Sequence, residues 1–218
     1  MNSCVIVTGG KLDVQFAFEF MKEEQPKLLI AADKGLAFFE ETGMLPTRIV
    51  GDFDTLGMEL LPKYEALGVP IQTYDPVKDA TDTEIAVRRA MELGADQITL
   101  LGASGGNRLD HLFGNVMTMM IPEKEGIPCF MVDPHNRLRI LTKPLDICRK
   151  EQYGKYISLV PLTTDVYGVT LTGFRYPLWD ARLGVENFGS LGISNELTED
   201  HGRIDFRSGI LLMLECKD

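Results

Sequence analysis

The sequence predicts an α/β N-terminal domain with a mainly parallel sheet, followed by an all-β C-terminal domain with antiparallel strands. Along the first two thirds of the chain, short apolar runs alternate with helical patterns, which is typical of parallel strands joined by crossover helices. After about Leu141, strand-like runs separated by glycine-containing turns replace the helical patterns. A chain of 218 residues suffices for two such domains. We expect them to span residues 1–140 and 141–218.

The strands of the N-terminal sheet are predicted from short apolar runs rich in β-branched residues. The run 28–32 is apolar throughout, as expected of a strand buried on both faces. The runs are 4–7, 28–32, 48–50, 70–74, 97–101 and 129–132.

Helices are predicted between these runs, where apolar residues recur at helical spacing. Thr81 and Glu84 have the spacing of a capping box, and Gly94 predicts the end of the helix that the box opens. The predicted helices are 12–24, 36–41, 56–67, 82–93 and one that contains Leu112, Phe113, Val116, Met117 and Met120.

The C-terminal part is predicted to be an antiparallel β domain that begins between Asn136 and Tyr156. Short strand-like runs are separated there by Thr-Gly, Asn-Phe-Gly, Asp-His-Gly and Ser-Gly turn signals, and no helical stripe is visible. The runs are 156–160, 166–171, 203–206 and 209–214.

Composition excludes several classes of function. With 22 basic and 32 acidic residues, the net charge is −10 at pH 7. We therefore expect no nucleic-acid partner, because duplex binders carry a basic surface. The charge is compatible with a nucleotide enzyme, because bound magnesium offsets carboxylates and phosphates alike.

We also expect a cytoplasmic protein that does not bind membranes. The chain has no apolar run near the ~20 residues that a membrane-spanning helix needs, and its N-terminus lacks the basic region of a signal peptide. Cys4, Cys129, Cys148 and Cys216 are far apart in the sequence, which favours reduced thiols over disulfides.

Aspartates recur just after the carboxyl ends of the predicted strands. In an open parallel sheet these ends face one crevice, so carboxylates far apart in the sequence meet there. Such a set repels itself unless a cation binds between its members, and oxygen-only ligands favour Mg²⁺. The alternative is that aspartate is simply common in turns and caps. The aspartates are Asp33, Asp52, Asp54, Asp75, Asp79, Asp82, Asp110 and Asp133.

Among these aspartates, the pair in the segment Gly51-Asp-Phe-Asp54 has the most specific spacing for a metal site. If it is extended, the carboxylates of Asp52 and Asp54 point the same way, because side chains alternate along a strand. A glycine in front of them permits close approach of the backbone to a ligand.

A glycine-rich segment, Gly102 to His111, joins a predicted strand to a predicted helix. Such a loop exposes backbone N–H groups at the positive end of a helix and can bind phosphate, and Arg108 adds a guanidinium that matches phosphate oxygens. His111 lies where it could contact the ligand. The alternative is a flexible glycine turn. No Ser/His/Asp or Cys/His set is apparent in the sequence, which disfavours nucleophilic catalysis.

Several motifs together resemble the thiamine pyrophosphokinase family. The combination is specific, although each piece alone is not, and the resemblance runs over nearly the whole chain, from about Val5 to Leu214. The motifs are Ala32-Asp-Lys-Gly35, Gly51-Asp-Phe-Asp54, Asp79-Ala-Thr-Asp82 and Gly102…Gly105-Gly106…Arg108-Leu-Asp110, with Thr172-Gly-Phe174 and Gly192-Ile-Ser-Asn195 resembling the thiamine-binding half.

The resemblance implies an enzyme that transfers a pyrophosphoryl group from ATP to the thiamine hydroxyl and yields thiamine diphosphate and AMP. It implies that the α/β N-terminal domain is followed by an all-β sandwich C-terminal domain, and that the protein is a homodimer with thiamine bound where subunits meet. Asp52, Asp54 and Asp79 would be catalytic and would surround Mg²⁺, while Ser194 and Asn195 would lie against thiamine. The residues implied for ATP binding are Asp33, Thr81, Asp82, Gly102, Gly105, Gly106, Arg108, Asp110 and His111.

Two other functions remain open at this point. A non-enzymatic nucleotide or thiamine sensor would be expected to lose the aspartates, which are all present here. A Mg²⁺-dependent phosphohydrolase needs no second organic substrate, and the Ser194-Asn195 element counts against it. Pyrophosphoryl transfer needs positioning and charge neutralisation but no protein nucleophile. Asp79 or Asp54 could accept the hydroxyl proton, and the sequence does not choose between them.

Overall fold

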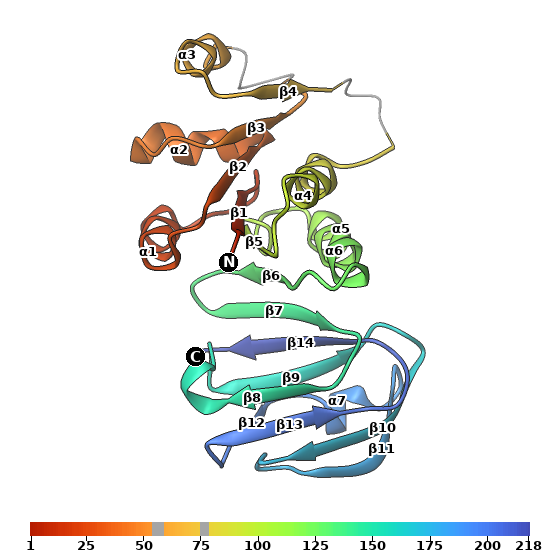
Figure 1. The fold of residues 1–218 in the computed structure, drawn as a ribbon. Coiled ribbons are helices and arrows are strands. Elements are labelled where there is room, and N and C mark those ends of the chain that lie inside the picture. Colours follow the sequence, from red (N-terminus) through yellow and green to blue (C-terminus); the bar gives the residue numbers. More distant parts are fainter. Residues whose placement is uncertain (54–58, 75–78) are drawn as a thin grey trace. The chain divides into compact units, whose positions relative to one another are not determined.

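The computed structural model describes residues 1–53, 59–74 and 79–218 (Figure 1). The chain divides into two compact units, Met1–Pro134 and His135–Asp218. The first is an α/β unit with a parallel sheet and the second is an antiparallel β unit, so the predicted fold class is confirmed. The division falls a few residues before the expected boundary at 140/141, because strand β7 (Asn136–Leu141) pairs along its length with β14 (Leu211–Cys216) of the second unit.

The sheet of the first unit has the strand order β6-β5-β1-β2-β3-β4, and each neighbouring pair is parallel. All six predicted strands are present. Isoleucine side chains of the central strands are fully buried, as the uninterrupted apolar runs predict, whereas Leu28 and Leu29 at the start of β2 are half-buried. The strands are β1 (Ser3–Val7), β2 (Leu28–Ala32), β3 (Arg48–Gly51), β4 (Ile71–Thr73), β5 (Gln97–Leu101) and β6 (Cys129–Val132).

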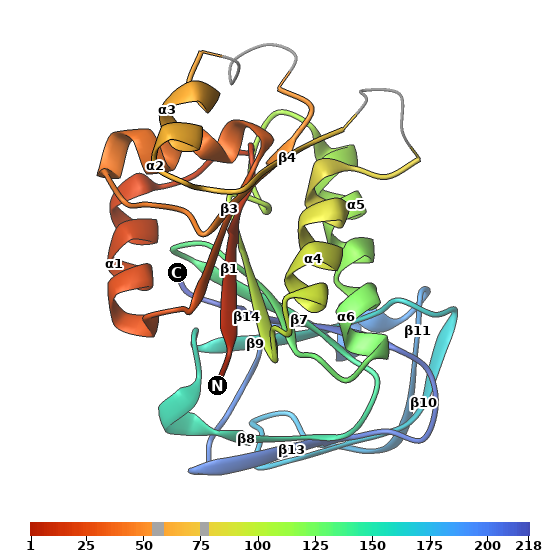
Figure 2. The same cartoon turned by 45° about the horizontal axis from the view of Figure 1, so that its top comes forward.

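Helices cover both faces of this sheet. Figure 2 shows α1 and α2 on one face and α4, α5 and α6 on the other. A short 3₁₀ turn, Asp33–Gly35, follows β2 directly. The helices are α1 (Val14–Glu24), α2 (Leu36–Thr42), α3 (Leu61–Ala66), α4 (Asp82–Glu92), α5 (Leu109–Thr118) and α6 (Met120–Lys124).

Two of the predicted helices differ from the observed ones. For the helix predicted over 56–67, residues 56–58 lie outside the described residues, 59 and 60 form a turn, and α3 starts at Leu61 with a proline in its first turn. The helix predicted around Leu112 is two helices, α5 and α6, divided at Met119. Pro122 explains the division, because it has no N–H to donate to the carbonyl of Thr118.

Side chains cap two helices as helix chemistry requires. The carboxylate of Asp13 accepts a hydrogen bond from the N–H of Phe16 at 2.9 Å, and the hydroxyl of Thr81 accepts one from the N–H of Glu84 at 3.2 Å. The predicted cap at Thr81 is therefore confirmed. The Glu84 carboxylate accepts from Arg88 Nε at 2.9 Å on the next turn, so it supports α4 along its length.

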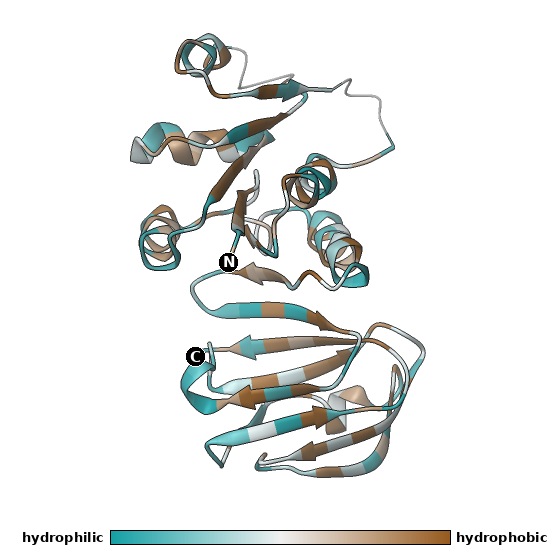
Figure 3. Cartoon of the chain, viewed as in Figure 1, coloured by the Kyte–Doolittle hydropathy of each residue, from teal (hydrophilic) through white to brown (hydrophobic). Residues whose placement is uncertain are grey.

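The second unit is a sandwich of two antiparallel sheets. Their strand orders are β12-β9-β14-β7 and β11-β10-β13-β8, and a core of apolar residues from both sheets, such as Leu159, Met213, Val169 and Ile204, fills the space between them. Figure 3 shows hydrophobic and hydrophilic residues alternating along these strands. The remaining strands are β8 (Leu145–Cys148), β9 (Tyr156–Pro161), β10 (Asp165–Thr172), β11 (Leu178–Gly184), β12 (Asn195–Glu196) and β13 (His201–Asp205).

Several elements of this unit have no counterpart in the prediction. Strands β7, β8, β11 and β12 carry charged or polar residues within short runs, and a one-turn helix α7 (Phe188–Leu191) lies where no helical stripe is visible. All four cysteines are free, as predicted, and Cys4 and Cys129 are buried. Burial raises the pKa of the Cys4 thiol to about 12. Within the described part of the chain, no helix is both long and apolar enough to cross a membrane.

Candidate active site

A cavity of about 520 Å³ opens at the carboxyl ends of β1, β2 and β5 in the first unit. The chain runs outward from β1 to β4 and then returns to place β5 on the other side of β1. Ligands bind at such a switch point of an open parallel sheet, because the loops after the two neighbouring strands diverge there. The cavity is lined by residues 8–11, 32–34, 81–83, 102–103, 105–108, 110–111 and 114–115.

All residues that the sequence assigns to ATP line this cavity. They come from the turn after β2, the start of α4, the glycine loop and the start of α5. They are Asp33, Thr81, Asp82, Gly102, Gly105, Gly106, Arg108, Asp110 and His111. The structure therefore brings together residues almost eighty positions apart, while the identity of their ligand stays a prediction. Asp52 and Asp79 are not among the lining residues, and Asp54 lies outside the described residues.

Two glycines let the loops after β1 and β5 approach each other closely. A Cβ on Gly10 would come within 2.7 Å of the Gly105 carbonyl oxygen and closer still to that of Gly102. Gly102 itself has a φ of +71°, in the left-handed region, and its missing Cβ faces the Thr8 carbonyl oxygen. A side chain at either position would push the glycine loop away from β1.

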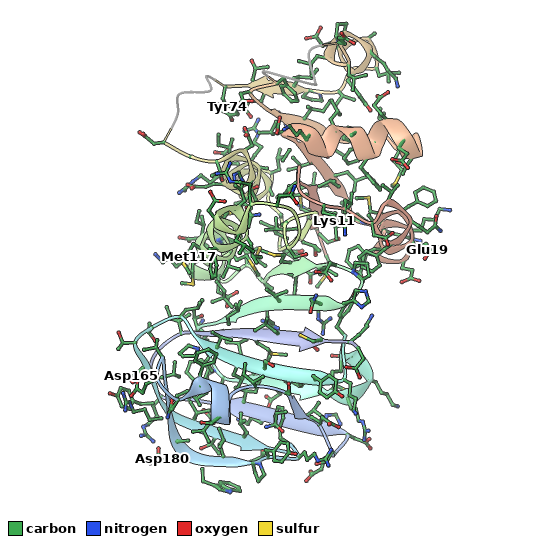
Figure 4. All side chains as sticks on the ribbon, turned by 180° about the vertical axis from the view of Figure 1, so that it is seen from behind. Lys11, Glu19, Tyr74, Met117, Asp165 and Asp180 are labelled. Carbon is green, nitrogen blue, oxygen red and sulfur yellow. The ribbon has the colours of Figure 1, made fainter. Side chains whose placement is uncertain are left out.

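The structure adds two cations to this site that the sequence reading missed. Lys11 lies in the segment between β1 and α1 (Figure 4), and Lys34 lies in the 3₁₀ turn after β2; both line the cavity. A lysine that binds phosphate outside a fixed motif has no characteristic spacing, so the sequence alone does not single it out. The available signal was Gly9-Gly10 directly after a predicted strand, which marks the same kind of turn as the glycine loop.

Arg108 and Asp110 form an ion pair at the mouth of the cavity. Arg108 Nε donates to Asp110 Oδ1 at 2.8 Å, and this hydrogen bond lowers the pKa of the Asp110 carboxyl to about 2. Their side chains are 69% and 62% exposed, so the pair is screened by water and contributes little to stability. The guanidinium can therefore leave the Asp110 carboxylate and bind a phosphate with little loss of stability.

The pKa of the Asp33 carboxyl, which also lines the cavity, is shifted in the direction opposite to that of Asp110. Burial raises its pKa, the backbone N–H of Lys34 opposes that rise, and the negative charges of Asp82 and Asp52 add to it. Its φ of +47° is rare for a residue with a side chain. The charges of Asp82 and Asp52 thus both act on Asp33, and this excess of negative charge suits a hard divalent cation bound by oxygen atoms. Within the described ranges no group of three ligands is already arranged around one point.

The structure corrects the argument for Asp52 and Asp54. The segment between them is not extended, because Phe53 has a φ of +50° and buries its ring in the core with 2% exposure. Side chains therefore do not alternate along this segment as they do along a strand. The two-residue spacing of Asp52 and Asp54 is thus no evidence that their carboxylates point the same way. Phe53 fixes the backbone next to Asp52 by packing instead.

We expect Asp33→Asn to raise the melting temperature by about 2 °C at pH 7. The pKa of Asp33 is raised in the folded protein, so its ionised form opposes folding above that pKa, and asparagine removes this penalty. Below pH ~3 the carboxyl is mostly protonated in both folded and unfolded chains, and the difference should vanish. Thermal unfolding from pH 3 to 8 without metal checks this, and a variant less stable than the wild type at pH 7 would contradict it.

In the second unit, Ser194 and Asn195 differ in their surroundings. Ser194 is exposed with a φ of +57°, and its N–H donates to Ser158 Oγ at 3.0 Å. Asn195 is buried, and its amide accepts from Tyr176 N at 3.0 Å and donates to Tyr176 O at 2.8 Å. The Asn195 side chain therefore fixes the backbone at Tyr176, and contact of either residue with thiamine stays a prediction.

Comparisons with known proteins agree with the motifs. Residues 20–131 match the family model of the thiamin pyrophosphokinase catalytic domain, and residues 144–211 match that of its vitamin B1 binding domain. The thiamine pyrophosphokinase of Bacillus subtilis (strain 168) is 31% identical over 218 residues, which cover 100% of both chains.

Solved structures give the same result. The crystal structure of the Bacillus subtilis enzyme is similar with a TM-score of 0.84 at 30% identity, covering 99% of both chains. That of thiamin pyrophosphokinase from Geobacillus thermodenitrificans has a TM-score of 0.83 at 32% identity, covering 99% of this chain and 98% of the other. The yeast enzyme shares the fold, with a TM-score of 0.81 at 16% identity, covering 99% and 86%.

Proposed function

The chain belongs to the thiamine pyrophosphokinase family, and we propose that it binds ATP with Mg²⁺ in the cavity of its first unit for transfer of the pyrophosphoryl group to thiamine. One observation carries the proposal: a glycine loop, two lysines and the Arg108 guanidinium line the same cavity as Asp33 and Asp82. Cationic and N–H donors bind phosphate oxygens, and the negative charge of Asp33 and Asp82 favours a metal ion bound together with the phosphates.

The reaction displaces AMP from the β-phosphorus of ATP. The thiamine hydroxyl oxygen forms a bond to that phosphorus, and the bond to the oxygen bridging the α- and β-phosphorus breaks. The hydroxyl proton passes to a carboxylate, for which Asp79 and Asp54 are the candidates. Lys11, Lys34 and Arg108 would balance the charge of the phosphates while the glycine loop holds them in line.

We assign the metal ligands to Asp52, Asp54 and Asp79, as the family motifs imply. Burial is the largest cause of the raised pKa of Asp33, and the negative charges of Asp82 and Asp52 add to it, which supports an excess of negative charge near Asp52 that a divalent cation would offset. Bound Mg²⁺ would neutralise the triphosphate and stabilise charge that develops during transfer.

We assign thiamine to the second unit, with Ser194 as a contact and Asn195 supporting it through the backbone at Tyr176. We further propose a cytoplasmic homodimer. Its support is that both units expose large apolar side chains, among them Phe113 at 64% and Trp179 at 71%. Sedimentation velocity at assay concentrations tests the dimer, and a fully active monomer would contradict it.

The reaction is tested by incubating the protein with thiamine, ATP and Mg²⁺ and separating the products. AMP and thiamine diphosphate in equal amounts are expected. ADP and phosphate would instead indicate a phosphohydrolase, and binding of either substrate without turnover would indicate a sensor.

Arg108→Ala is expected to raise the KM for ATP about tenfold and to change that for thiamine less than twofold. The reason is that the guanidinium lines the phosphate side of the site, where a charged hydrogen bond is lost. Steady-state kinetics with each substrate varied in turn checks this. Arg203→Ala, which removes an arginine that pairs with Asp146 in the second unit, is the matched control. A larger rise in the KM for thiamine than in the KM for ATP would contradict the assignment of Arg108 to ATP.

A further inference from the structure

Asp133 makes a short hydrogen bond to the glycine loop. It directly follows β6, and its Oδ2 accepts from the hydroxyl of Ser104 at 2.6 Å. The pairing of Leu101 with Val132 in neighbouring parallel strands sets the residues that follow them side by side. A distance of 2.6 Å is typical of a hydroxyl bonded to an ionised carboxylate, which is stronger than a bond between neutral groups.

This bond is one of three that fasten consecutive residues of the glycine loop to different parts of the first unit. The Ala103 carbonyl oxygen accepts from Asn115 Nδ2 on α5 at 3.0 Å. The Gly105 carbonyl oxygen accepts from the N–H of Lys11, after β1, at 3.2 Å. Ser104, between them, is held through its hydroxyl by Asp133, which follows β6. Because both carbonyl oxygens already have donors, they are held by the protein rather than turned toward an anionic ligand.

We propose that Asp133 is a positioning residue, whose carboxylate holds the glycine loop through Ser104 in the shape that binds the ATP phosphates. This rests on the function proposed above. Loops rich in glycine lose much backbone freedom on binding, so a loop fixed beforehand binds its ligand more tightly. Asp133 acts through its acceptor oxygen and not as a metal ligand.

The position of Asp133 distinguishes it from the other aspartates at this edge of the sheet. Asp33 and Asp82 line the cavity, whereas Asp133 is not among the described residues that line it. Its partner Ser104 lies between the lining residues Ala103 and Gly105. The carboxylate therefore acts on the loop through the hydrogen bond that it accepts from Ser104 and not through contact with the ligand, so a neutral side chain that keeps an acceptor oxygen should retain most of its effect.

The experiment measures the dissociation constant of ATP·Mg²⁺ by calorimetry without thiamine, together with steady-state kinetics. Asp133→Ala and Ser104→Ala should each weaken ATP binding at least about tenfold. Asp133→Asn and Ser104→Thr, which keep an acceptor and a hydroxyl, should stay within about threefold of the wild type. The KM for thiamine should change less than twofold in all four variants.

The double variant Ser104→Ala/Asp133→Ala should bind ATP no more weakly than the weaker single variant, because both changes remove one interaction. Three outcomes would overturn the proposal. The losses of ATP affinity in the two single alanine variants could add up in the double variant, or Asp133→Asn could lose as much ATP affinity as Asp133→Ala. The third is that the alanine variants have a lower melting temperature but unchanged ATP affinity. If Asp133→Ala does not fold, the ATP affinities of Ser104→Ala and Asp133→Asn still test the proposal. A wild type that binds ATP but yields no thiamine diphosphate contradicts only the proposed function.

Discussion

Asp52→Asn is expected to lower kcat at least ~100-fold at saturating ATP, thiamine and Mg²⁺, which is the scale of losing one electrostatic contact at a reacting centre. Asp52 follows β3 directly, and its charge is felt by Asp33 in the cavity. Asparagine keeps the shape of the side chain but removes the charge that a metal ion needs. Quenched-flow or steady-state assays of AMP release measure the effect.

The fold should survive this change, because removing one of several mutually repelling carboxylates relieves repulsion. We therefore expect a melting temperature at pH 7 no lower than that of the wild type. Asp200→Asn, in an exposed turn of the second unit, is the matched control and should retain full kcat. Near-normal turnover of Asp52→Asn at saturating Mg²⁺ would remove Asp52 from the metal site.

The strands of the first unit and the composition of the cavity could be predicted because their signals are local. A buried parallel strand such as Leu28–Ala32 must be apolar along its whole length, and a loop that binds phosphate needs glycines in one short segment. Parallel pairing then gathers the strand ends without further information, which is why Asp33 and Arg108 line one cavity.

Other features depend on partners that the local sequence does not reveal. The strand Asn136–Leu141 contains two arginines and is stabilised by pairing with Leu211–Cys216, where Glu215 accepts from Arg137. Phe53 adopts a left-handed conformation because its ring packs in the core, which invalidates an argument based on strand alternation. Met117 has the spacing of a core residue in α5 but is 51% exposed at the outer side of that helix (Figure 4).

The second large effect is expected for Gly10→Ala, which should weaken ATP binding at least ~100-fold, as displacement of binding groups by about 1 Å can do. The added Cβ would meet the carbonyl oxygens of Gly102 and Gly105, both backbone atoms that no side-chain rotation can move aside. The loop must therefore shift away from β1. We also expect the free energy of unfolding to fall by about 1–3 kcal/mol, the usual range for an overpacked contact.

Gly189→Ala is the matched control, because it makes the same chemical change where a Cβ would meet nothing within 4 Å. Calorimetric titration with ATP·Mg²⁺ and urea unfolding of both variants separate the loss of affinity from the loss of stability. If Gly10→Ala binds ATP like the wild type, the glycine loop can yield without altering the site. Its anchoring to Lys11, Asn115 and Asp133 would then be irrelevant to affinity. If the loop is rigid, Gly10→Ala and Ser104→Ala should both raise the dissociation constant of ATP and leave the KM for thiamine unchanged. The reason is that the two changes displace the same backbone from opposite sides.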